Sequence, residues 1–235
     1  MQAKYKRILL KISGEALSGA KGHGYDVSAV ENVAAQVKTL VENGVQVGIV
    51  VGGGNFWRGR QGNEMDRVTA DYMGMLATVI NALALSDAFE RKGLESRVMT
   101  SLAIASVGEP FQFKTAQRYL SEGKVVVFGG GTGNPCFSTD TGASLRATEI
   151  GADVLLLAKN VDGIYDSDPK VNPDAKKFDV LTYEEYVERD LKAMDTSAVL
   201  MCKESGIKVH VFALNGENAI VNAVFSESKG TVIGG

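Results

Sequence analysis

Two runs of consecutive glycines, each placed directly after a short apolar segment, constrain the fold of this chain most strongly. Residues 52–54 are all glycine and follow the largely apolar residues 45–51, and residues 129–131 are all glycine and follow residues 125–128. A strand that ends in consecutive glycines forms an anion-binding nest of bare backbone N–H groups, most often for phosphate. Two such turns in one small domain predict two phosphate-bearing ligands that face each other.

Short apolar segments alternate with amphipathic segments along the chain. Strands are expected at residues 7–13, 45–51, 96–99, 124–128, 153–159, 207–213 and 231–233. Helices are expected between them, including a long one over residues 65–91 and one that begins at a capping box of Ser28 and Glu31. This order predicts a three-layer α/β fold with a mostly parallel sheet, in one domain that spans residues 1–235. Ligands of such sheets bind beyond the carboxyl ends of the strands, where both glycine turns fall.

The composition sets broad limits on the class of protein. The chain has 235 residues, of which 45% are hydrophobic, enough for one large α/β domain with a filled core. Its net charge of −3 gives no electrostatic reason to expect a nucleic acid partner. No apolar stretch reaches the ~18 residues of a membrane span, so we expect a soluble, cytoplasmic protein without membrane contact. Cys136 and Cys202 form neither a metal-binding spacing nor a disulfide framework.

Two common nucleotide-binding fingerprints are absent from the sequence. The pattern G-x-x-x-x-G-K-[ST] fails because Val125 follows the only Gly-Lys pair. The pattern G-x-G-x-x-G fails in both turns, because Trp57 and Asn134 stand where its last glycine would be. The glycine turns therefore belong to neither class, although phosphate binding itself stays open.

Several charged residues lie close to the expected strand ends or within the long helix. Lys11 lies near the end of the first expected strand, three residues before Gly14. It either places its ammonium on phosphates or is a plain exposed lysine at the end of a strand. Arg58 follows the first glycine turn and could neutralise phosphate charge, whereas the turn alone could be a tight connection to a helix. Asp71 lies among apolar residues of the long helix and either faces water or holds a ligand hydroxyl.

The segment 129–140, with the sequence GGGTGNPCFSTD, is the strongest functional signal. It combines a glycine turn with hydroxyl, amide, aromatic and carboxylate side chains, so it could contact a phosphate, a sugar and a base together. The alternative interpretation is an irregular loop that caps a helix. The acidic segment 159–169 is by default a solvated loop, and His23 and His210 match no catalytic triad and no metal pattern.

In combination and in order, these motifs resemble the amino acid kinase family, and within it the uridylate branch. The similarity runs the whole length of the chain through KISGEAL (11–17), VVGGGNFWRG (50–59), DYMGMLATVINALAL (71–85), GGGTGNPCFSTD (129–140), VDGIYDSDP (161–169) and KAMD (192–195). The run GTGNP, followed by an aromatic and two hydroxyl residues, is typical of this branch. The resemblance implies the fold of that family and transfer of the γ-phosphoryl group of ATP to UMP in pyrimidine nucleotide biosynthesis, with Mg²⁺ on the ATP phosphates.

The resemblance also implies roles for individual residues. The ATP side would comprise Lys11, Ile12, Ser13, Gly14, Gly54, Arg58, Lys159, Asn160, Tyr165 and Asp168, with the register between Lys159 and Asn160 open by one residue. The UMP side would comprise Gly53, Asp71, Thr132, Gly133, Asn134, Pro135, Cys136, Phe137, Ser138 and Thr139. Lys11, Arg58 and Asp195 would be catalytic, and Asp195 would organise the catalytic lysine.

Regulation and assembly are implied by the resemblance alone. The residues Gly19, Ala20, Lys21, Gly22, His23 and Gly24 match a segment linked to activation by GTP. Members of the branch are inhibited by UTP and form homohexamers built from dimers. The part of the chain before residue ~150 would serve UMP and oligomer contacts, and the part after it the ATP nucleoside. Two alternatives stay open: an acyl-phosphate-forming kinase of the same fold, and a nucleotide sensor without catalysis.

Overall fold

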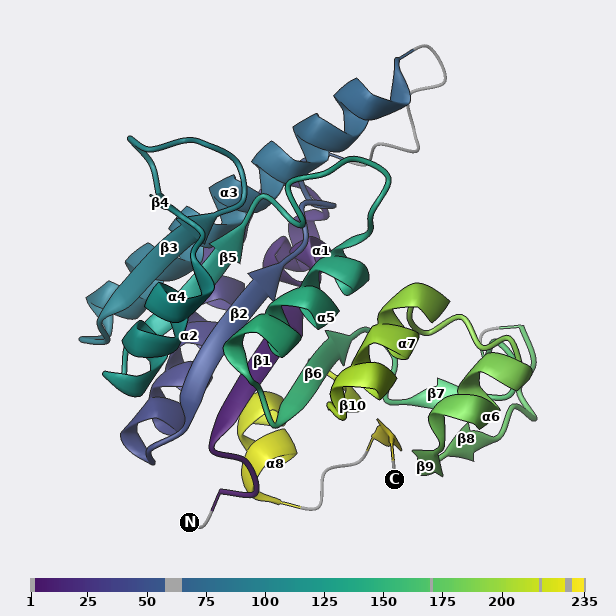
Figure 1. Cartoon of the computed structure of the whole chain (residues 1–235). Helices are drawn as coiled ribbons and strands as arrows, with labels where there is room; N and C mark the ends of the chain where they lie inside the picture. The colour runs from purple at the N-terminus through teal and green to yellow at the C-terminus, as the bar shows by residue number, and fades with distance from the viewer. Residues whose placement is uncertain (1–2, 58–64, 170, 216, 227–229, 235) are drawn as a thin grey trace.

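The strand β1 (Arg7–Ile12) lies at the centre of a nine-stranded sheet (Figure 1). The computed structural model describes residues 3–57, 65–169, 171–215, 217–226 and 230–234. Across the sheet the strands follow the order β4 (Glu109–Pro110), β3 (Ser96–Thr100), β5 (Val125–Gly129), β2 (Gln46–Val51), β1, β6 (Val154–Lys159), β10 (Lys208–Ala213), β11 (Thr231–Ile233) and β9 (Val180–Leu181). Every pairing in this sheet is parallel except that of β10 with β11, which confirms the predicted mostly parallel sheet.

The side chains of β1 alternate between two apolar cores, one on each face of the sheet. Ile8, Leu10 and Ile12 lie in the first core and Leu9 lies in the second, and all four are fully buried. Central strands of parallel sheets read as nearly continuous apolar runs because helices cover both of their faces. The sequence RILLKI has this character and breaks it only at Arg7 and at Lys11.

Helices form the outer two layers of the fold (Figure 1). The first core is covered by α2 (Val27–Glu42), α3 (Arg67–Arg91) and α8 (Ala219–Phe225). The second core is covered by α4 (Phe113–Ser121), α5 (Thr139–Ile150), α6 (Tyr183–Glu188) and α7 (Thr196–Ser205). Short elements complete the chain: α1 (Gly14–Leu17), the 3₁₀ helix η1 (Gly19–Lys21), and an antiparallel pair of β7 (Ile164–Tyr165) with β8 (Lys177–Phe178). The predicted three-layer α/β architecture is therefore confirmed.

The start of α2 differs from the prediction. The N-cap is Asp26, whose carboxylate accepts hydrogen bonds from the backbone amides of Ser28 and Ala29. The predicted capping box of Ser28 and Glu31 is therefore wrong, and α2 begins one residue before Ser28. Aspartate and serine are both good N-caps, so the local sequence alone did not choose between them.

The helix α3 is long and apolar enough to cross a membrane by length and composition alone, with a mean hydropathy of 1.4 over 18 residues. Polar residues such as Asn81 and Ser86 interrupt its apolar sequence, so no uninterrupted apolar stretch reaches that length. One side of this helix packs in the first core through Ala82, Leu85 and Phe89. Its apolar composition therefore agrees with a helix that packs in a protein core.

Candidate active site

The ends of β1 and β2 approach each other so closely that side chains do not fit between them. A Cβ atom on Gly14 would lie 2.4 Å from Oδ1 of Asn55 and 2.6 Å from the carbonyl oxygen of Gly52. A Cβ atom on Gly53 would lie 2.7 Å from the carbonyl oxygen of Gly74 in α3. None of residues 52–54 has a positive φ, so this turn lacks the left-handed residue of the predicted nest. Gly14 and Gly53 therefore have a packing reason, whatever ligand the turn also contacts.

Two buried asparagines, Asn55 and Asn81, hold this first glycine turn in place. The amide of Asn81 in α3 donates to the carbonyl oxygen of Gly52 (2.7 Å) and to Oδ1 of Asn55 (2.7 Å). The amide of Asn55 donates to Oδ1 of Asn81 (3.0 Å) and to the carbonyl oxygen of Gly24 (2.6 Å). The first turn and the segment 19–24, which resembles a GTP-linked segment, are thereby joined. Neither asparagine was predicted to have this role, because an amide in a loop or helix carries no signal beyond its polarity.

Lys11, Asp140 and Lys159 form an ion-pair cluster at the carboxyl ends of β1 and β6. Nζ of Lys11 lies 2.8 Å from Oδ1 of Asp140, and Nζ of Lys159 lies 3.7 Å from Oδ2 of the same carboxylate. Lys159 also donates to the carbonyl oxygen of Ala193. The neighbouring strands supply the two lysines, and the first turn of α5 supplies Asp140. The cluster carries two positive charges and one negative charge, which suits a polyphosphate ligand.

Burial and charge act in opposite directions on Asp140. Burial alone would raise the pKa of Asp140, but the charges of Lys11 and Lys159 outweigh it and hold that pKa below its ordinary value. Burial also lowers the pKa of Lys159, and the nearby Asp140 offsets this only in part. Asp140 is therefore ionised at neutral pH and keeps the two ammonium groups close together.

Asp140, and not Asp195, is the carboxylate in contact with Lys11. Asp195 was expected to organise the catalytic lysine, but it lies exposed at the N-cap of α7, and its charge acts on Lys159. Lys159 was expected on the ATP nucleoside, whereas its ammonium lies in the Lys11–Asp140 cluster. Asp140 was predicted only as part of the second glycine loop, because an aspartate in the first turn of a helix is common for its favourable charge alone.

The second glycine loop, residues 129–137, has the left-handed geometry that the first turn lacks. Gly130, Gly131 and Gly133 have φ values of +84°, +57° and +81°. Thr78 of α3 accepts a hydrogen bond from the amide of Gly130 at 2.8 Å. Ser101, which follows β3, donates its hydroxyl to the carbonyl oxygen of Gly131 at 2.9 Å. The backbone of this loop is therefore fixed by side chains from two other elements.

The far half of this loop is fastened to α3 by Asp71. Its carboxylate accepts a hydrogen bond of 2.8 Å from the backbone amide of Cys136, an exposed residue with a positive φ of 69°. Thr132 exchanges hydrogen bonds with the backbone of Asn134, and the Ser138 hydroxyl caps α5 by accepting from the amide of Thr141. Asp71, predicted on the UMP side, thus lies in contact with the loop predicted for the same ligand.

The predicted nucleoside residues beyond β6 lie in a different part of the site. The hydroxyl of Tyr165 donates to Oδ1 of Asp162 at 2.6 Å, and Nζ of Lys177 lies 3.2 Å from Oδ2. Asn160 is exposed, and the carbonyl oxygen of Asp168 accepts from the amides of two following residues. Tyr165 and Lys177 belong to the β7–β8 pair, which follows β6 in the chain (Figure 1).

Arg58 lies outside the described residues, so its predicted catalytic role stays a prediction.

Neither histidine has a described contact with the Lys11–Asp140–Lys159 cluster. His23 packs edge-on against the ring of Phe56, and His210 is buried in β10, where burial lowers its pKa to about 4. Among the described residues no group of three His, Cys, Asp or Glu side chains could hold a metal ion.

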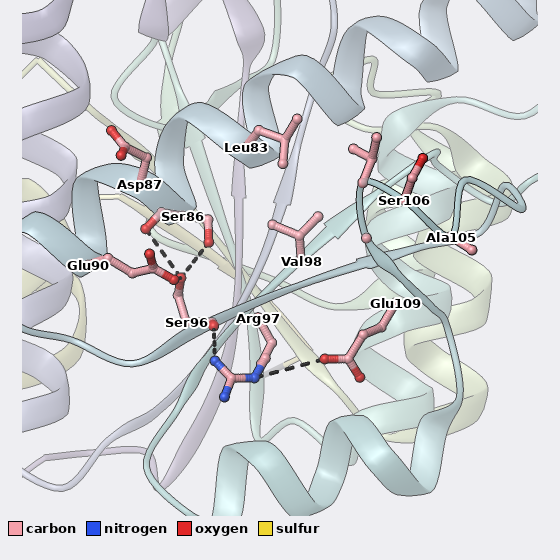
Figure 2. Close-up of a pocket in the computed structure, with 12 residues that line it drawn as sticks. Leu83, Ser86, Asp87, Glu90, Ser96, Arg97, Val98, Ala105, Ser106 and Glu109 are labelled. Carbon is pink, nitrogen blue, oxygen red and sulfur yellow. Dashed lines mark hydrogen bonds and ion pairs between the residues drawn. The ribbon is translucent and has the colours of Figure 1, made fainter.

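A separate cavity of about 500 Å³ lies between α3 and the segment that joins β3 to β4 (Figure 2). Leu83 and Val98 line it with three carboxylates, those of Asp87, Glu90 and Glu109. Arg97 supplies a positive charge there and lies 3.9 Å from Glu109. None of the residues predicted for ATP, UMP or GTP lines this cavity.

The chain is similar to known kinases over almost its whole length. The sequence model of the amino acid kinase family matches residues 6–213. The UMP kinase from Bacillus anthracis is 38% identical with a TM-score of 0.94, covering 97% of this chain and 96% of that chain. The UMP kinase from Ureaplasma parvum is 36% identical with a TM-score of 0.93, covering 98% and 99%. The uridylate kinase from Archaeoglobus fulgidus is 30% identical with a TM-score of 0.75, covering 96% and 99%.

These matches agree with the geometry of the site. The nine-stranded sheet, the glycine turns at its carboxyl edge and the lysine pair around Asp140 occur together in one fold. The family match over residues 6–213 covers all of these features except the strand β11. The chain is therefore a phosphotransferase of the amino acid kinase family.

Proposed function

We propose that this protein transfers the γ-phosphoryl group of ATP to UMP and releases ADP and UDP. The observation that carries the proposal is the cluster of Lys11, Asp140 and Lys159, which lies between the first glycine turn and the start of α5. A phosphoryl-transfer site has to concentrate positive charge where donor and acceptor phosphates meet. The kinship with UMP kinases and the GTGNP run in the second glycine loop support UMP as the acceptor.

In this reaction a phosphate oxygen of UMP forms a bond to the γ-phosphorus, and the bond from that phosphorus to the β,γ-bridging oxygen breaks. The acceptor is already an oxyanion, so no general base is required, which agrees with a site without histidine. Lys11 and Lys159 would neutralise charge on the transferring group, and Asp140 would keep their ammonium groups in register. The amides of residues 12–14 and 53–54 would contact the phosphates from the ends of β1 and β2.

The two substrates would occupy different halves of the carboxyl edge. Residues 130–139 and Asp71 would hold UMP, because their loop is fastened to α3 on the β5 side of the sheet. Residues beyond β6, among them Asn160, Tyr165 and Asp168, would hold the ATP nucleoside. The Lys11–Asp140–Lys159 cluster lies between these halves, where the phosphates would meet. This division matches the predicted division of the chain near residue ~150.

Mg²⁺ would be held by the ATP phosphates and by water rather than by a cage of side chains. The described residues contain no group of three metal-ligating side chains, and the charge of Asp140 already lies against two lysines. Phosphate oxygens and water are ligands that suit Mg²⁺, because this ion keeps several waters and prefers substrate phosphates. When bound, the ion would neutralise charge on the donor phosphates.

Regulation and assembly belong to the proposal as well. GTP would activate through residues 19–24, which Asn55 joins to the first glycine turn, and UTP would inhibit. The protein would form a homohexamer in the cytoplasm, without nucleic acid or membrane partners. An apolar stripe on the outer side of α3 supports association between copies; its members are 40–47% exposed and comprise Val68, Tyr72, Leu76, Ile80 and Leu83.

One assay tests the activity directly. ADP formation from ATP is measured with UMP, CMP, acetylglutamate or carbamate as acceptor, each with and without GTP. We expect turnover with UMP well above that with the other acceptors, and faster turnover with GTP. Turnover with acetylglutamate or carbamate instead would identify an acyl-phosphate-forming kinase, and ATP binding without turnover would identify a nucleotide sensor. Light scattering of the same sample measures the assembly state.

A further inference from the structure

Arg146 of α5 is a buried cation at the back of the second glycine loop. Only 4% of the residue is exposed. Its guanidinium carbon lies 3.7 Å from the ring centroid of Phe111, Nη1 pairs with the carboxylate of Glu149, and Nη2 donates to Oγ of Ser101 at 3.0 Å. The guanidinium is therefore held from three sides in one orientation.

Ser101 is the link between this arginine and the second glycine loop. Its hydroxyl donates to the carbonyl oxygen of Gly131 at 2.9 Å, and its backbone amide donates to the carbonyl oxygen of Gly129 at 3.1 Å. A Cβ atom on Gly133 would lie 3.1 Å from Cβ of Ser101. Ser101 thus contacts the loop at three positions, each of them a glycine.

The hydrogen-bond chemistry gives this link a direction. Arginine has donors and no acceptor, so Oγ of Ser101 accepts from Arg146 and turns its own hydrogen to Gly131. In a trans peptide the N–H and the C=O point in opposite directions, so the N–H of Thr132 points away from Ser101. Ser101 thus holds the carbonyl oxygen of Gly131, and Arg146 donates to the hydroxyl oxygen that makes this contact.

A buried charge is an expensive way to fill this space. Burying an ion requires full pairing, and an apolar side chain of similar size often gives equal or greater stability. Nε of Arg146 has no hydrogen-bond partner among the described residues, so the pairing is incomplete. The guanidinium is thus better explained by its orientation of the Ser101 hydroxyl than by a contribution to the stability of the core.

We propose that Arg146 is a positioning residue for the acceptor nucleotide. Acting through Ser101, it holds the Gly131–Thr132 peptide so that the Thr132 amide donates into the acceptor site. The identity of the acceptor rests on the proposed function, but the ordering of the loop does not. Arg146 itself stays behind the loop and does not touch the substrate.

Steady-state kinetics separates this role from a purely structural one. The variants Arg146→Met and Ser101→Ala are compared with Arg118→Met and Ser121→Ala, which alter exposed side chains of α4. We expect KM for UMP to rise about five- to tenfold in the first pair, the scale of one lost hydrogen bond, with KM for ATP unchanged. Arg146→Lys keeps a donor and should recover part of the affinity. A parallel loss for both substrates, or no change in KM for UMP, would overturn the proposal.

Hydrogen–deuterium exchange tests the loop without any ligand. Amides of residues 130–136 should exchange faster in Ser101→Ala and Arg146→Met, while those of β1 and β6 keep the wild-type rates. Unchanged exchange in the loop of Ser101→Ala, a small substitution that the fold should tolerate, would contradict the proposal. If the wild-type protein shows no turnover with UMP, the proposed function fails, and this exchange experiment still decides on the positioning role.

Discussion

Nζ of Lys11 lies 2.8 Å from Oδ1 of Asp140, although Lys11 lies on the first strand and Asp140 on the fifth helix. The side chains of both residues are largely buried, with 11% and 14% exposure. The same carboxylate also faces Lys159. Asp140 thus lets two ammonium groups approach each other at the carboxyl edge of the sheet. Without its negative charge, the two ammonium groups would repel each other.

Asp140→Asn should lower kcat by about 10²-fold, because the two lysines then lose the charge that holds them together. The substitution keeps the size and polarity of the side chain, so the fold should persist by circular dichroism. Asp87→Asn is the matched control, since Asp87 is an exposed helical aspartate that pairs with Arg91. A kcat within threefold of wild type for Asp140→Asn would remove this residue from the mechanism.

Lys11→Ala should reduce turnover by ~10²-fold or more, the scale of one lost transition-state contact. Lys38→Ala removes a half-buried lysine that pairs with Glu42 and donates to the backbone oxygen of Lys92, and it should leave turnover unchanged. Both variants are assayed with saturating ATP and UMP. Near-normal turnover of Lys11→Ala would show that the transferring group does not depend on this ammonium.

Asp71→Asn should weaken UMP binding about tenfold, because in the proposed site this carboxylate would accept two ribose hydroxyl bonds, for which an amide is a poor substitute. The structure adds a second function, since the same carboxylate accepts from the amide of Cys136. An asparagine oxygen still accepts that bond, whereas Asp71→Ala loses it and should weaken binding further. Isothermal titration calorimetry with UMP distinguishes the two variants, and equal affinity for wild type and Asp71→Asn would reject the ribose contact.

Gly53→Ala should destabilise the protein by about 1–3 kcal/mol, because its Cβ would lie 2.7 Å from the backbone oxygen of Gly74. Gly74→Ala offers the matched comparison in α3. The nearest atom to its Cβ would be Cδ1 of Trp57 at 3.9 Å, so alanine should stabilise the helix by about 0.5–1 kcal/mol. Urea unfolding measures both changes, and similar stability of the two variants would contradict the packing argument.

His210 should make the protein lose stability as the pH falls from 6.5 towards 4. Burial lowers the pKa of His210 to about 4, so in this window the unfolded chain takes up a proton that the native state refuses. The full difference corresponds to about 3 kcal/mol. His210→Gln should flatten the pH dependence of the unfolding free energy between pH 6.5 and 4.5, whatever its effect at pH 7.5. An identical slope in both proteins would mean that other groups cause the loss.

Much of the fold follows from local patterns in the sequence. The apolar runs that form β1, β2, β5 and β6 are short, and their alternation with helices favours a parallel sheet. The start of α2 was misplaced because two good caps lie two residues apart. The short pair β7–β8 was not foreseen, because two-residue strands leave no periodic pattern.

The glycine turns, the order of the strands along the chain and the polar loop after β5 can be read from the residues alone. Which side chains meet depends on how the strands and helices pack. It paired Lys11 with Asp140 instead of Asp195, brought Lys159 to the same carboxylate, and set Arg146 and Ser101 behind Gly131. The physical reason is that ion pairs and hydrogen bonds act over a few ångströms between residues far apart in the chain. No local pattern contains those distances until the sheet has brought the strand ends together.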